Sequence, residues 1–299
     1  MSYQWVILGD GKSLGGTGLL VVMPVKIQLG TVLQAGKISG PMIIAFTPPL
    51  PLSQMNPKLL IDADFFFYRA AAAAEMEQEY SPDLTVIVGD FRRGKQIVEQ
   101  ELDKLRTKFD TEDLILYFTD TENFRKDIDP NYKGNRTKRK PCGYLKLKNW
   151  GVETYASLIM PRLEADDALG IAATSGEYKN FVLVSPDKDM LQIPCRIYNL
   201  KDEFNQTEED AERKLYEQTL TGDSTDGYSG CPSVGPKRAG ILLDKSKGKY
   251  WPAVVKAFVD NGLTEEDALK NLRLARILQS SDWDCENQRP IMYEPPTYA

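Results

Sequence analysis

The sequence contains no histidine, and its four cysteines form no C-x-x-C pair. The absence of histidine excludes imidazole acid-base chemistry and argues against most zinc sites. The cysteines are too widely separated to indicate a disulfide framework, and a reduced, cytoplasmic setting is therefore expected. They are Cys142, Cys195, Cys231 and Cys285.

A long apolar run is also missing. The best apolar stretch, from Leu19 to Val25, is interrupted by Pro24 and followed by Lys26, whereas a membrane helix needs roughly 18 or more apolar residues. We predict no membrane span. A chain of 299 residues, 42% of them hydrophobic, can bury the core of one large domain or two modest ones.

The sequence does contain a set of carboxylates in five short clusters. Three clusters end an apolar run that resembles a buried strand, so a parallel sheet would bring several negative charges to one edge. Such charges repel one another unless cations lie among them. An aspartate before a helix is usually an N-cap, but the repeated placement favours an oxygen-ligated site for Mg²⁺ or Mn²⁺. The carboxylates are Asp62, Asp64, Asp120, Glu164, Asp166, Asp167, Asp187, Asp189, Asp223 and Asp226.

The net charge is -6, yet one segment is strongly basic. Residues 131–148 contain no acidic residue, and a charge run of this kind is commonly a solvated loop. Here the run follows Asp120 and includes Tyr132 and Tyr144, which favours an arch that tracks phosphates and stacks bases. Its basic residues are Lys133, Arg136, Lys138, Arg139, Lys140, Lys146 and Lys148.

The chain changes character near residue 55. Residues 1–54 are rich in glycine and proline and almost uncharged, which predicts a poorly structured extension, or a segment upstream of a natural start at Met55. From Lys58 strand-like and helix-like segments alternate, which predicts a parallel α/β sheet. The expected strands are Leu59–Ile61, Leu114–Phe118, Val152–Tyr155, Phe181–Val184 and Arg196–Tyr198. The expected helices are Phe65–Glu79, Gly94–Phe109, Glu164–Thr174, Glu208–Leu220, Pro236–Leu243, Trp251–Asn261 and Glu265–Gln279, with an extended tail from Ser280.

The carboxylates that follow the strands suggest a specific chemistry. Two divalent ions about 4 Å apart, bridged by such acids, would activate a water molecule and stabilise the leaving oxygen of a phosphoryl displacement. Glu164 and Asp167 share one face at the start of a helix, with Asp166 beside them in its first turn. No side-chain general base is then required, which suits a chain without histidine.

Short motifs follow one another in a defined order along the chain. They are Asp62 with Arg69, then Phe118–Asp120, Tyr132–Arg136, Leu163–Asp167, Ser185–Asp189 and Gly222–Asp226. In this order they resemble the motifs of the 5′-nuclease (flap endonuclease) superfamily. The likeness is strongest to the 5′→3′ exonucleases of short-tailed lytic phages, through Asp129–Lys133, Pro141–Tyr144 and Asp226–Gly230. It extends from about Leu59 to Gln279.

The resemblance implies a fold and a division into domains. The fold would be α/β, with a PIN-like (resolvase-like) parallel-sheet nuclease core, a helical arch, and a small α-helical domain that carries a helix-three-turn-helix. The catalytic domain would span residues 55–200, with the arch at about 123–150. Residues 201–299 would form the helical DNA-binding domain and its C-terminal tail.

The resemblance also implies a metal centre. It would hold two Mg²⁺ ions, for which Mn²⁺ can substitute, and a K⁺ ion would lie at the helix-three-turn-helix. Lys133 and Arg136 match basic residues that orient the scissile phosphate and stabilise its transition-state charge. Asp64 has no consistent counterpart and is expected to cap a helix. The first metal site would use Asp62, Asp120, Glu164, Asp166 and Asp167, and the second Asp187, Asp189, Asp223 and Asp226.

A DNA-binding surface is implied as well. Pro236 would begin a helix whose free N–H groups, with Lys237, hold a duplex phosphate, although residues 227–239 alone could equally be a glycine-rich turn between packed helices. Binding should tolerate any base sequence and weaken with salt. The expected DNA-binding residues are Arg69, Arg125, Tyr132, Lys138, Arg139, Lys140, Gly230, Gly235 and Lys237.

The resemblance therefore implies a Mg²⁺-dependent 5′→3′ exodeoxyribonuclease and flap endonuclease that releases 5′-phosphorylated products. It would act as a monomer in the host cytoplasm, in phage DNA replication and recombination, on duplexes with free 5′ ends, nicks or flaps. RNA–DNA hybrids are expected substrates too, through removal of RNA primers.

Two alternatives stay open. A haloacid-dehalogenase-like phosphatase would use Asp62 as its nucleophile, but it would leave the Glu164 cluster and the basic run without a role. A non-catalytic protein that binds branched DNA would use the acids only to stabilise its fold with metal.

Overall fold

A six-stranded sheet lies at the centre of the residues that the computed structural model describes, 56–297. The strand order is β5-β4-β1-β6-β7-β8, and every neighbouring pair is parallel except β7 with β8. The predictions for residues 1–54 lie outside the described residues. The strands are β1 (Lys58–Asp62), β4 (Leu114–Tyr117), β5 (Ser157–Leu158), β6 (Phe181–Val184), β7 (Arg196–Tyr198) and β8 (Glu203–Asn205).

Strand β1 is central because its residues suit burial on both faces. Leu59, Leu60 and Ile61 have no exposed surface, and continuous apolar runs are typical of parallel strands that helices cover on both sides. The strands predicted at β1, β4, β6 and β7 are confirmed. The chemistry-bearing residues that follow β1, β4 and β6 therefore share one edge of the sheet.

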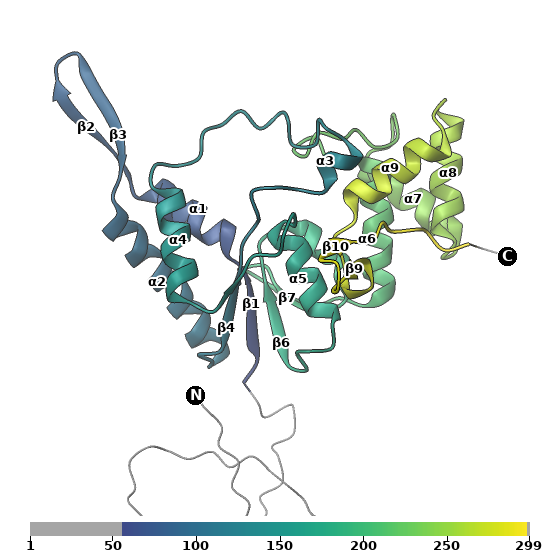
Figure 1. The fold of residues 1–299 in the computed structure, drawn as a ribbon. Coiled ribbons are helices and arrows are strands. Elements are labelled where there is room, and N and C mark those ends of the chain that lie inside the picture. Colours follow the sequence, from purple (N-terminus) through teal and green to yellow (C-terminus); the bar gives the residue numbers. More distant parts are fainter. Residues whose placement is uncertain (1–55, 298–299) are drawn as a thin grey trace, which may run out of the picture. The chain divides into compact units, whose positions relative to one another are not determined.

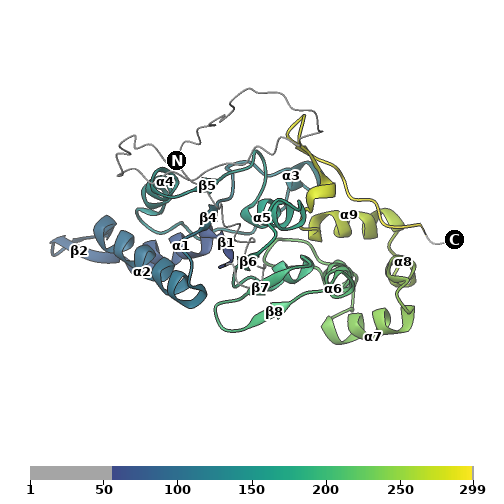
Figure 2. The ribbon, with the colours of Figure 1, turned by 90° about the horizontal axis from the view of Figure 1, so that it is seen from below.

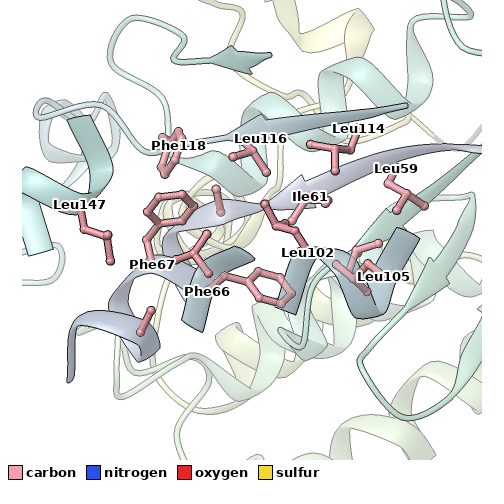
Figure 3. Close-up of a cluster of buried hydrophobic side chains, with 14 of the residues drawn as sticks. Leu59, Ile61, Phe66, Phe67, Leu102, Leu105, Leu114, Leu116, Phe118 and Leu147 are labelled. Atoms are coloured by element: carbon pink, nitrogen blue, oxygen red, sulfur yellow. The ribbon is translucent and has the colours of Figure 1, made fainter. Parts of the chain in front are cut away.

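Helices cover both faces of the sheet (Figures 1 and 2). Leu59 and Ile61 pack against side chains of α1, α2 and α4, including Phe67 and Leu102 (Figure 3). Leu60 points to the opposite face, where it packs with α5 and η2. These helices are α1 (Ala63–Ala73), α2 (Phe91–Phe109), α4 (Tyr144–Thr154), α5 (Ala165–Thr174) and the 3₁₀ helix η2 (Lys188–Gln192).

Helix α4 replaces a predicted strand. The sequence predicts a strand at Val152–Tyr155, but these residues lie at the end of α4, and the strand that follows is the two-residue β5. Tyr144, Leu147 and Gly151 form the buried face of this helix. Gly151 allows close packing on α1, because a Cβ there would lie 2.4 Å from the ring of Phe67.

A β-hairpin replaces the second half of another predicted helix. The sequence predicts a helix over Phe65–Glu79, whereas α1 ends at Ala73 and is followed by β2 (Glu75–Ser81) and β3 (Leu84–Gly89). From Glu75 to Tyr80 acidic residues alternate with Met76, Gln78 and Tyr80, which suits a strand. The hairpin extends away from the sheet (Figure 1).

The arch is helical only at its two ends. The predicted arch, residues 123–150, begins with α3 (Arg125–Ile128) and ends in α4, but residues 129–143 form turns and irregular backbone. Pro141 and the left-handed Gly143 (φ 79°) disfavour a continuous helix there. This segment spans from α3 to α4 beyond the carboxyl ends of the strands (Figure 1).

Helices dominate the chain after β8, as predicted. Their apolar faces form a second core, in which Tyr216, Val254, Phe258 and Leu272 are fully buried. Strand β8 belongs to the sheet although it follows residue 200, and the described sheet and helices belong to one compact unit, Leu50–Ala299. The division at residue 200 therefore stays a prediction. The helices are α6 (Glu208–Thr221), α7 (Pro236–Ser246), α8 (Tyr250–Asp260) and α9 (Glu265–Ala275).

The C-terminal segment is more regular than the predicted extended tail. Helix α9 ends at Ala275 instead of Gln279, and the chain continues through η3 (Ser280–Asp282) into a short hairpin of β9 (Trp283–Asp284) and β10 (Arg289–Pro290). Within residues 56–297, no helix is long and apolar enough to cross a membrane.

Candidate active site

The sheet topology gathers carboxylates from different parts of the sequence. Strands β4, β1 and β6 are neighbours and run parallel. Asp62 is the last residue of β1, and Asp120 and Asp187 come three residues after the ends of β4 and β6, so all three lie at the edge where open α/β sheets bind their ligands. Helix α5 begins beside them and contributes Asp166 in its first turn.

Asp62, Asp166 and Asp187 act on one another electrostatically. Asp62 is buried, and burial raises its pKa to about 7, although a hydrogen bond from Ser185 (Oγ to Oδ2, 2.9 Å) opposes that change. Burial and the nearby charges of Asp62 and Asp187 raise the pKa of Asp166 well above its ordinary value. Carboxylates with raised pKa values in one place form a site that a cation would stabilise.

Asp189 adds a buried oxygen with no hydrogen bond. Its Oδ2 accepts a bond from Gln218 Nε2 at 2.7 Å, whereas Oδ1 is buried and has no hydrogen-bond partner among residues 56–297. Burial, followed by the charge of Asp187, raises the pKa of Asp189 to about 6. An unpaired buried carboxylate oxygen is costly, so Asp189 Oδ1 fits a divalent ion at this position.

Residues at the start of the arch neutralise two further acids. The Lys133 ammonium group contacts Glu164 and lies 3.6 Å from Asp226. The Tyr132 hydroxyl lies 3.1 Å from Glu164 and 2.9 Å from Asp226, and Arg136 is 2.6 Å from Asp226. Burial alone would raise the pKa of Glu164, but Lys133 and Arg125 hold it below the ordinary value.

The backbone also fixes Lys133 next to the acids. Its N–H donates to the Asp226 carbonyl oxygen at 2.8 Å, and its φ of 56° lies in the left-handed region. A non-glycine residue adopts that conformation only when surrounding contacts impose it. The predicted catalytic residue Lys133 thus lies beside the carboxylates. Arg136, three residues later in the sequence, contacts Asp226.

Asp120 and Asp223 lie at the rim of the acidic group. Each oxygen of Asp120 accepts a backbone N–H, from Thr121 or from Arg162, and the bond from Arg162 lowers its pKa most. A carboxylate oxygen can accept a second partner, so Asp120 can still bind a metal ion. Asp223 Oδ1 accepts the N–H of Thr225 at 2.7 Å, and Asp223 adds to the negative charge around Asp189.

Asp167 and Asp64 have other partners. Asp167 is fully buried and forms a two-bond ion pair with Arg125 (2.6 and 2.7 Å), and its Oδ1 also accepts the Leu278 N–H. Its Oδ2 also accepts the Glu164 N–H at 3.4 Å, so each oxygen has two hydrogen-bond partners and neither is left for the predicted ligand role. Asp64 was expected to cap a helix, but α1 has Asp62 at its N-cap, and Asp64 bonds instead to Tyr144 and Thr119.

The structure separates the predicted DNA-binding residues into three groups. Arg125 and Tyr132 are buried, and Gly230 is buried against the backbone of Gly222, so these three cannot lie on a DNA-binding surface as predicted. Arg69 and Arg139 are exposed, but they pair with Glu101 and Glu75. The remaining four are exposed and form no ion pair shorter than 4 Å within residues 56–297: Lys138, Lys140, Gly235 and Lys237.

Sequence reasoning missed two polar residues that contact the acids, Ser185 and Gln218, and a third, Gln192, that contacts Gln218. Ser185 could have been found, because it lies between strand β6 and Asp187. Gln218 and Gln192 carry no local signal, because a glutamine inside a helix is ordinarily exposed. Within the described part of the chain, no three carboxylate or thiol side chains converge closely enough to coordinate one ion. Two of the acids form ion pairs instead, Glu164 with Lys133 and Asp226 with Arg136.

A parallel α/β sheet with carboxylates along one edge, crossed by a basic arch and joined to a helical region, defines a phosphoryl-transfer enzyme of the nuclease class. A sequence description of the family "5′-3′ exonuclease, N-terminal resolvase-like domain" matches residues 57–219, more than half of the chain. The chain therefore belongs to the 5′-3′ exonuclease family.

Relatives support this assignment. The chain is 28% identical over 282 residues to the exonuclease of Escherichia phage T7, covering 79% of this chain and 93% of that protein. It is also 28% identical to the exodeoxyribonuclease of Enterobacteria phage T3, covering 79% and 92%. Among solved structures, the bacteriophage T5 D15 protein co-crystallised with metal ions matches with a TM-score of 0.54 at 16% identity, covering 73% of this chain and 89% of that one. The structural likeness confirms the predicted fold class.

Proposed function

We propose that this protein is a metal-dependent 5′→3′ exonuclease and flap endonuclease that hydrolyses DNA phosphodiesters and leaves 5′-phosphates. The observation that carries the proposal is Asp189 Oδ1, which is buried, has no hydrogen-bond partner within residues 56–297, and lies among acids with raised pKa values at the carboxyl edge of the sheet. The names of the phage relatives, an exonuclease and an exodeoxyribonuclease, support the same activity.

Two Mg²⁺ ions, replaceable by Mn²⁺, are proposed to bind these carboxylates. When bound, the ions would supply an activated water and stabilise the leaving oxygen. Asp167 is left out of the proposed set because it is fully buried and each of its oxygens already has two hydrogen-bond partners. The proposed ligands are Asp62, Asp120, Glu164, Asp166, Asp187, Asp189, Asp223 and Asp226.

Lys133 and Arg136 are proposed to act on the scissile phosphate. Both side chains lie at the start of the arch and contact the carboxylates directly. A cation at that position can orient a phosphate and stabilise the charge that develops on it. Lys133 is only partly exposed, with 18% of its side chain accessible, so water competes little for its ammonium group.

The proposed substrates are DNA duplexes with free 5′ ends, nicks or flaps, together with RNA–DNA hybrids. Lys138 and Lys140 are exposed on the arch, and Lys237 is exposed near the N-terminus of α7, where Gly235 is the N-cap. These positions suit phosphate contacts from the arch and from a helix N-terminus. A K⁺ ion between α6 and α7, and a monomeric protein in the host cytoplasm that acts in phage replication, recombination and RNA primer removal, complete the proposal.

Cleavage assays test the proposal directly. End-labelled blunt, nicked and flapped duplexes are incubated with Mg²⁺, with and without chelator, and the products are resolved by length. Asp166→Asn and Asp187→Asn should each lower cleavage by more than about 100-fold, because each removes a metal-binding charge, while duplex binding in chelator is retained. Asp260→Asn, on α8 and paired with Lys256, serves as the matched control.

Three outcomes would contradict the proposal. Normal turnover by both active-site variants would remove the metal assignment. Turnover of small phosphomonoesters with a phosphoaspartate at Asp62 would favour the phosphatase alternative. Duplex binding by the unmodified protein without any strand cleavage in Mg²⁺ would favour the non-catalytic DNA-binding alternative.

A further inference from the structure

We infer that Gln218 is a positioning residue for Asp189, and that Gln192 fixes the direction in which the Gln218 amide points. The inference rests on the proposed function and deepens it, because it identifies the side chains that orient one of the metal-binding carboxylates. Hydrogen bonds run in one direction from the Ile277 N–H through Gln192 and Gln218 to Asp189.

The chain ends at Asp189. Gln218 Nε2 donates to Asp189 Oδ2 at 2.7 Å and to the Tyr228 hydroxyl oxygen at 3.2 Å. Asp189 Oδ1 is buried and has no hydrogen-bond partner in the described part of the chain. One oxygen of the carboxylate is therefore held in place, and the other is left for an ion.

The direction of each amide follows from the group before it. The Ile277 N–H can only donate, and it bonds to Gln192 Oε1 at 3.2 Å. Gln192 Nε2 then donates to the Ala275 carbonyl at 2.8 Å and to Gln218 Oε1 at 2.7 Å. The Gln218 amide nitrogen must consequently face Asp189, because a reversed amide would set oxygen against carboxylate and nitrogen against nitrogen.

Burial makes this arrangement costly to break. Gln192 is 1% exposed and Gln218 is 7% exposed, so water cannot readily replace a lost hydrogen bond. The glutamines come from η2 and α6, and the backbone at residues 275–277 follows α9. Asp189 is thus oriented by the helical part of the chain as well as by the sheet. The residue that bonds to it, Gln218, lies on α6 and is therefore distant in sequence.

Gln218→Leu tests the inference, because leucine removes the amide and fills similar space. Mg²⁺ affinity of the full chain, measured by titration calorimetry without DNA, should fall about tenfold, as is typical when the partner of a metal ligand is removed. The melting temperature in chelator should also fall, because Asp189 Oδ2 and Gln192 Nε2 each lose a buried hydrogen-bond partner, so Mg²⁺ affinity is measured at a temperature at which the variant is folded. Gln192→Leu should weaken Mg²⁺ binding in the same direction by less. Glu217→Gln, the neighbouring residue on α6, is the matched control and should bind Mg²⁺ normally.

A double variant separates positioning from a general structural effect. In an Asp189→Asn background, Gln218→Leu should change Mg²⁺ affinity by less than about twofold, because the carboxylate that it orients is absent. If the leucine variant does not fold, Gln218→Met, which keeps the length of the side chain, replaces it in both comparisons.

Each outcome decides between the proposals. Unchanged Mg²⁺ affinity in the Gln218 variant, or an equal loss in the presence and absence of the Asp189 carboxylate, would overturn the positioning role and leave the proposed function intact. Failure of the unmodified protein to bind Mg²⁺ would instead contradict the proposed function.

Discussion

At the scale of single residues, the acidic edge of the sheet places like charges together inside the folded protein. Burial raises the pKa of Asp62 to about 7, and the charges of Asp64 and Asp187 add to this effect. Arg125, by contrast, compensates the buried charge of Asp167 completely, with two hydrogen bonds. A buried acid beside other acids, such as Asp62, destabilises the metal-free protein. A buried acid paired with a cation, such as Asp167, links the elements that carry the two partners.

The raised pKa of Asp62 predicts a specific pH dependence of stability without metal. Because the folded pKa of about 7 exceeds the ordinary value of 3.8, the folded protein binds this proton more tightly than the unfolded chain does. The resulting stabilisation is complete below about pH 4 and is lost as the pH rises to about 7. In chelator, we expect the free energy of unfolding to fall by roughly 2 kcal/mol between pH 5 and pH 8.

Urea denaturation at pH 5, 6, 7 and 8 measures this change. Asp62→Asn should make the profile less steep, with Asp166 and Asp189 accounting for the slope that remains, and the metal-free variant should be more stable than the parent at pH 8. Mg²⁺ should stabilise the parent more at pH 8 than at pH 5. Asp284→Asn, at the end of β9 and bonded to Asn287 outside the acidic site, is the control. Equal slopes in the parent and in Asp62→Asn would show that Asp62 does not hold its proton in this range.

The sequence predicted residues whose roles depend on local position, and it missed those whose roles depend on distant partners. Asp62, Asp120 and Asp187 were found because each follows a recognisable strand. Arg125 and Tyr132 were assigned to DNA binding because they lie in or near a basic run. Their burial depends on Asp167, Glu164 and Asp226, up to 94 residues away, and no local pattern reports such contacts.

At the scale of secondary-structure elements, the β2–β3 hairpin and the arch support each other. The Glu75 carboxylate accepts bonds from the Arg139 guanidinium at 2.5 and 3.1 Å and from the Cys142 N–H at 2.6 Å. The bond from Arg139 is the main cause that lowers the pKa of Glu75 to about 2. Gly89 touches the backbone of Cys142 so closely that a Cβ there would lie 2.3 Å from the carbonyl oxygen.

This contact predicts that Glu75 restrains the irregular part of the arch. Glu75→Gln removes the charge that holds Arg139, so we expect limited trypsin digestion at Lys138 and Arg139 to become several times faster. Mass spectrometry of early fragments locates the cleavage. Glu77→Gln, two residues along β2 and exposed, should be cut at the parental rate. Identical digestion of the two variants would mean that the hairpin does not restrain the arch.

Competing local signals explain why the sequence did not predict the hairpin. The alanines at residues 70–74 extend the helical pattern of α1, and glutamates are good helix formers, so a helix to Glu79 was expected. The alternation of acidic and other residues from Glu75 to Tyr80 is a weaker signal, and it determines the structure only because β3 pairs with it. The error at α4 has the same origin, since a short β-branched run does not reveal a helix that packs through Gly151.

At the scale of the whole molecule, the sheet core and the helical core meet at buried polar contacts. Arg125 joins Asp167 at the start of α5 to the carbonyls of Leu274 and Arg276, and Gln192 joins η2 to Ala275 and Ile277. The end of α9 and the two residues that follow it therefore connect Arg125 and Gln192 to the helical core. The sequence pattern predicted the sheet core and the helical core, but it did not predict the buried polar contacts between them.

The distribution of charge across the molecule predicts how duplex binding depends on salt. The net charge of -6 opposes DNA binding in general, so attraction must come from local basic positions such as Lys138 on the arch and Lys237 on α7, both exposed. Each lysine that contacts a phosphate releases about one counterion, so its loss should lower the slope of log K against log salt by about 1.

Fluorescence anisotropy of a labelled flapped duplex in chelator, from 50 to about 200 mM salt, measures these slopes. Lys138→Ala and Lys237→Ala should each lower the slope by about 1 for every duplex sequence tested, and the double variant should lower it by about 2, because the two lysines lie on separate elements. Lys256→Ala, which removes an exposed lysine paired with Asp260, should leave the slope unchanged. An unchanged slope in Lys237→Ala would remove the N-terminus of α7 from the DNA-binding surface, and the arch alone would then have to hold the duplex.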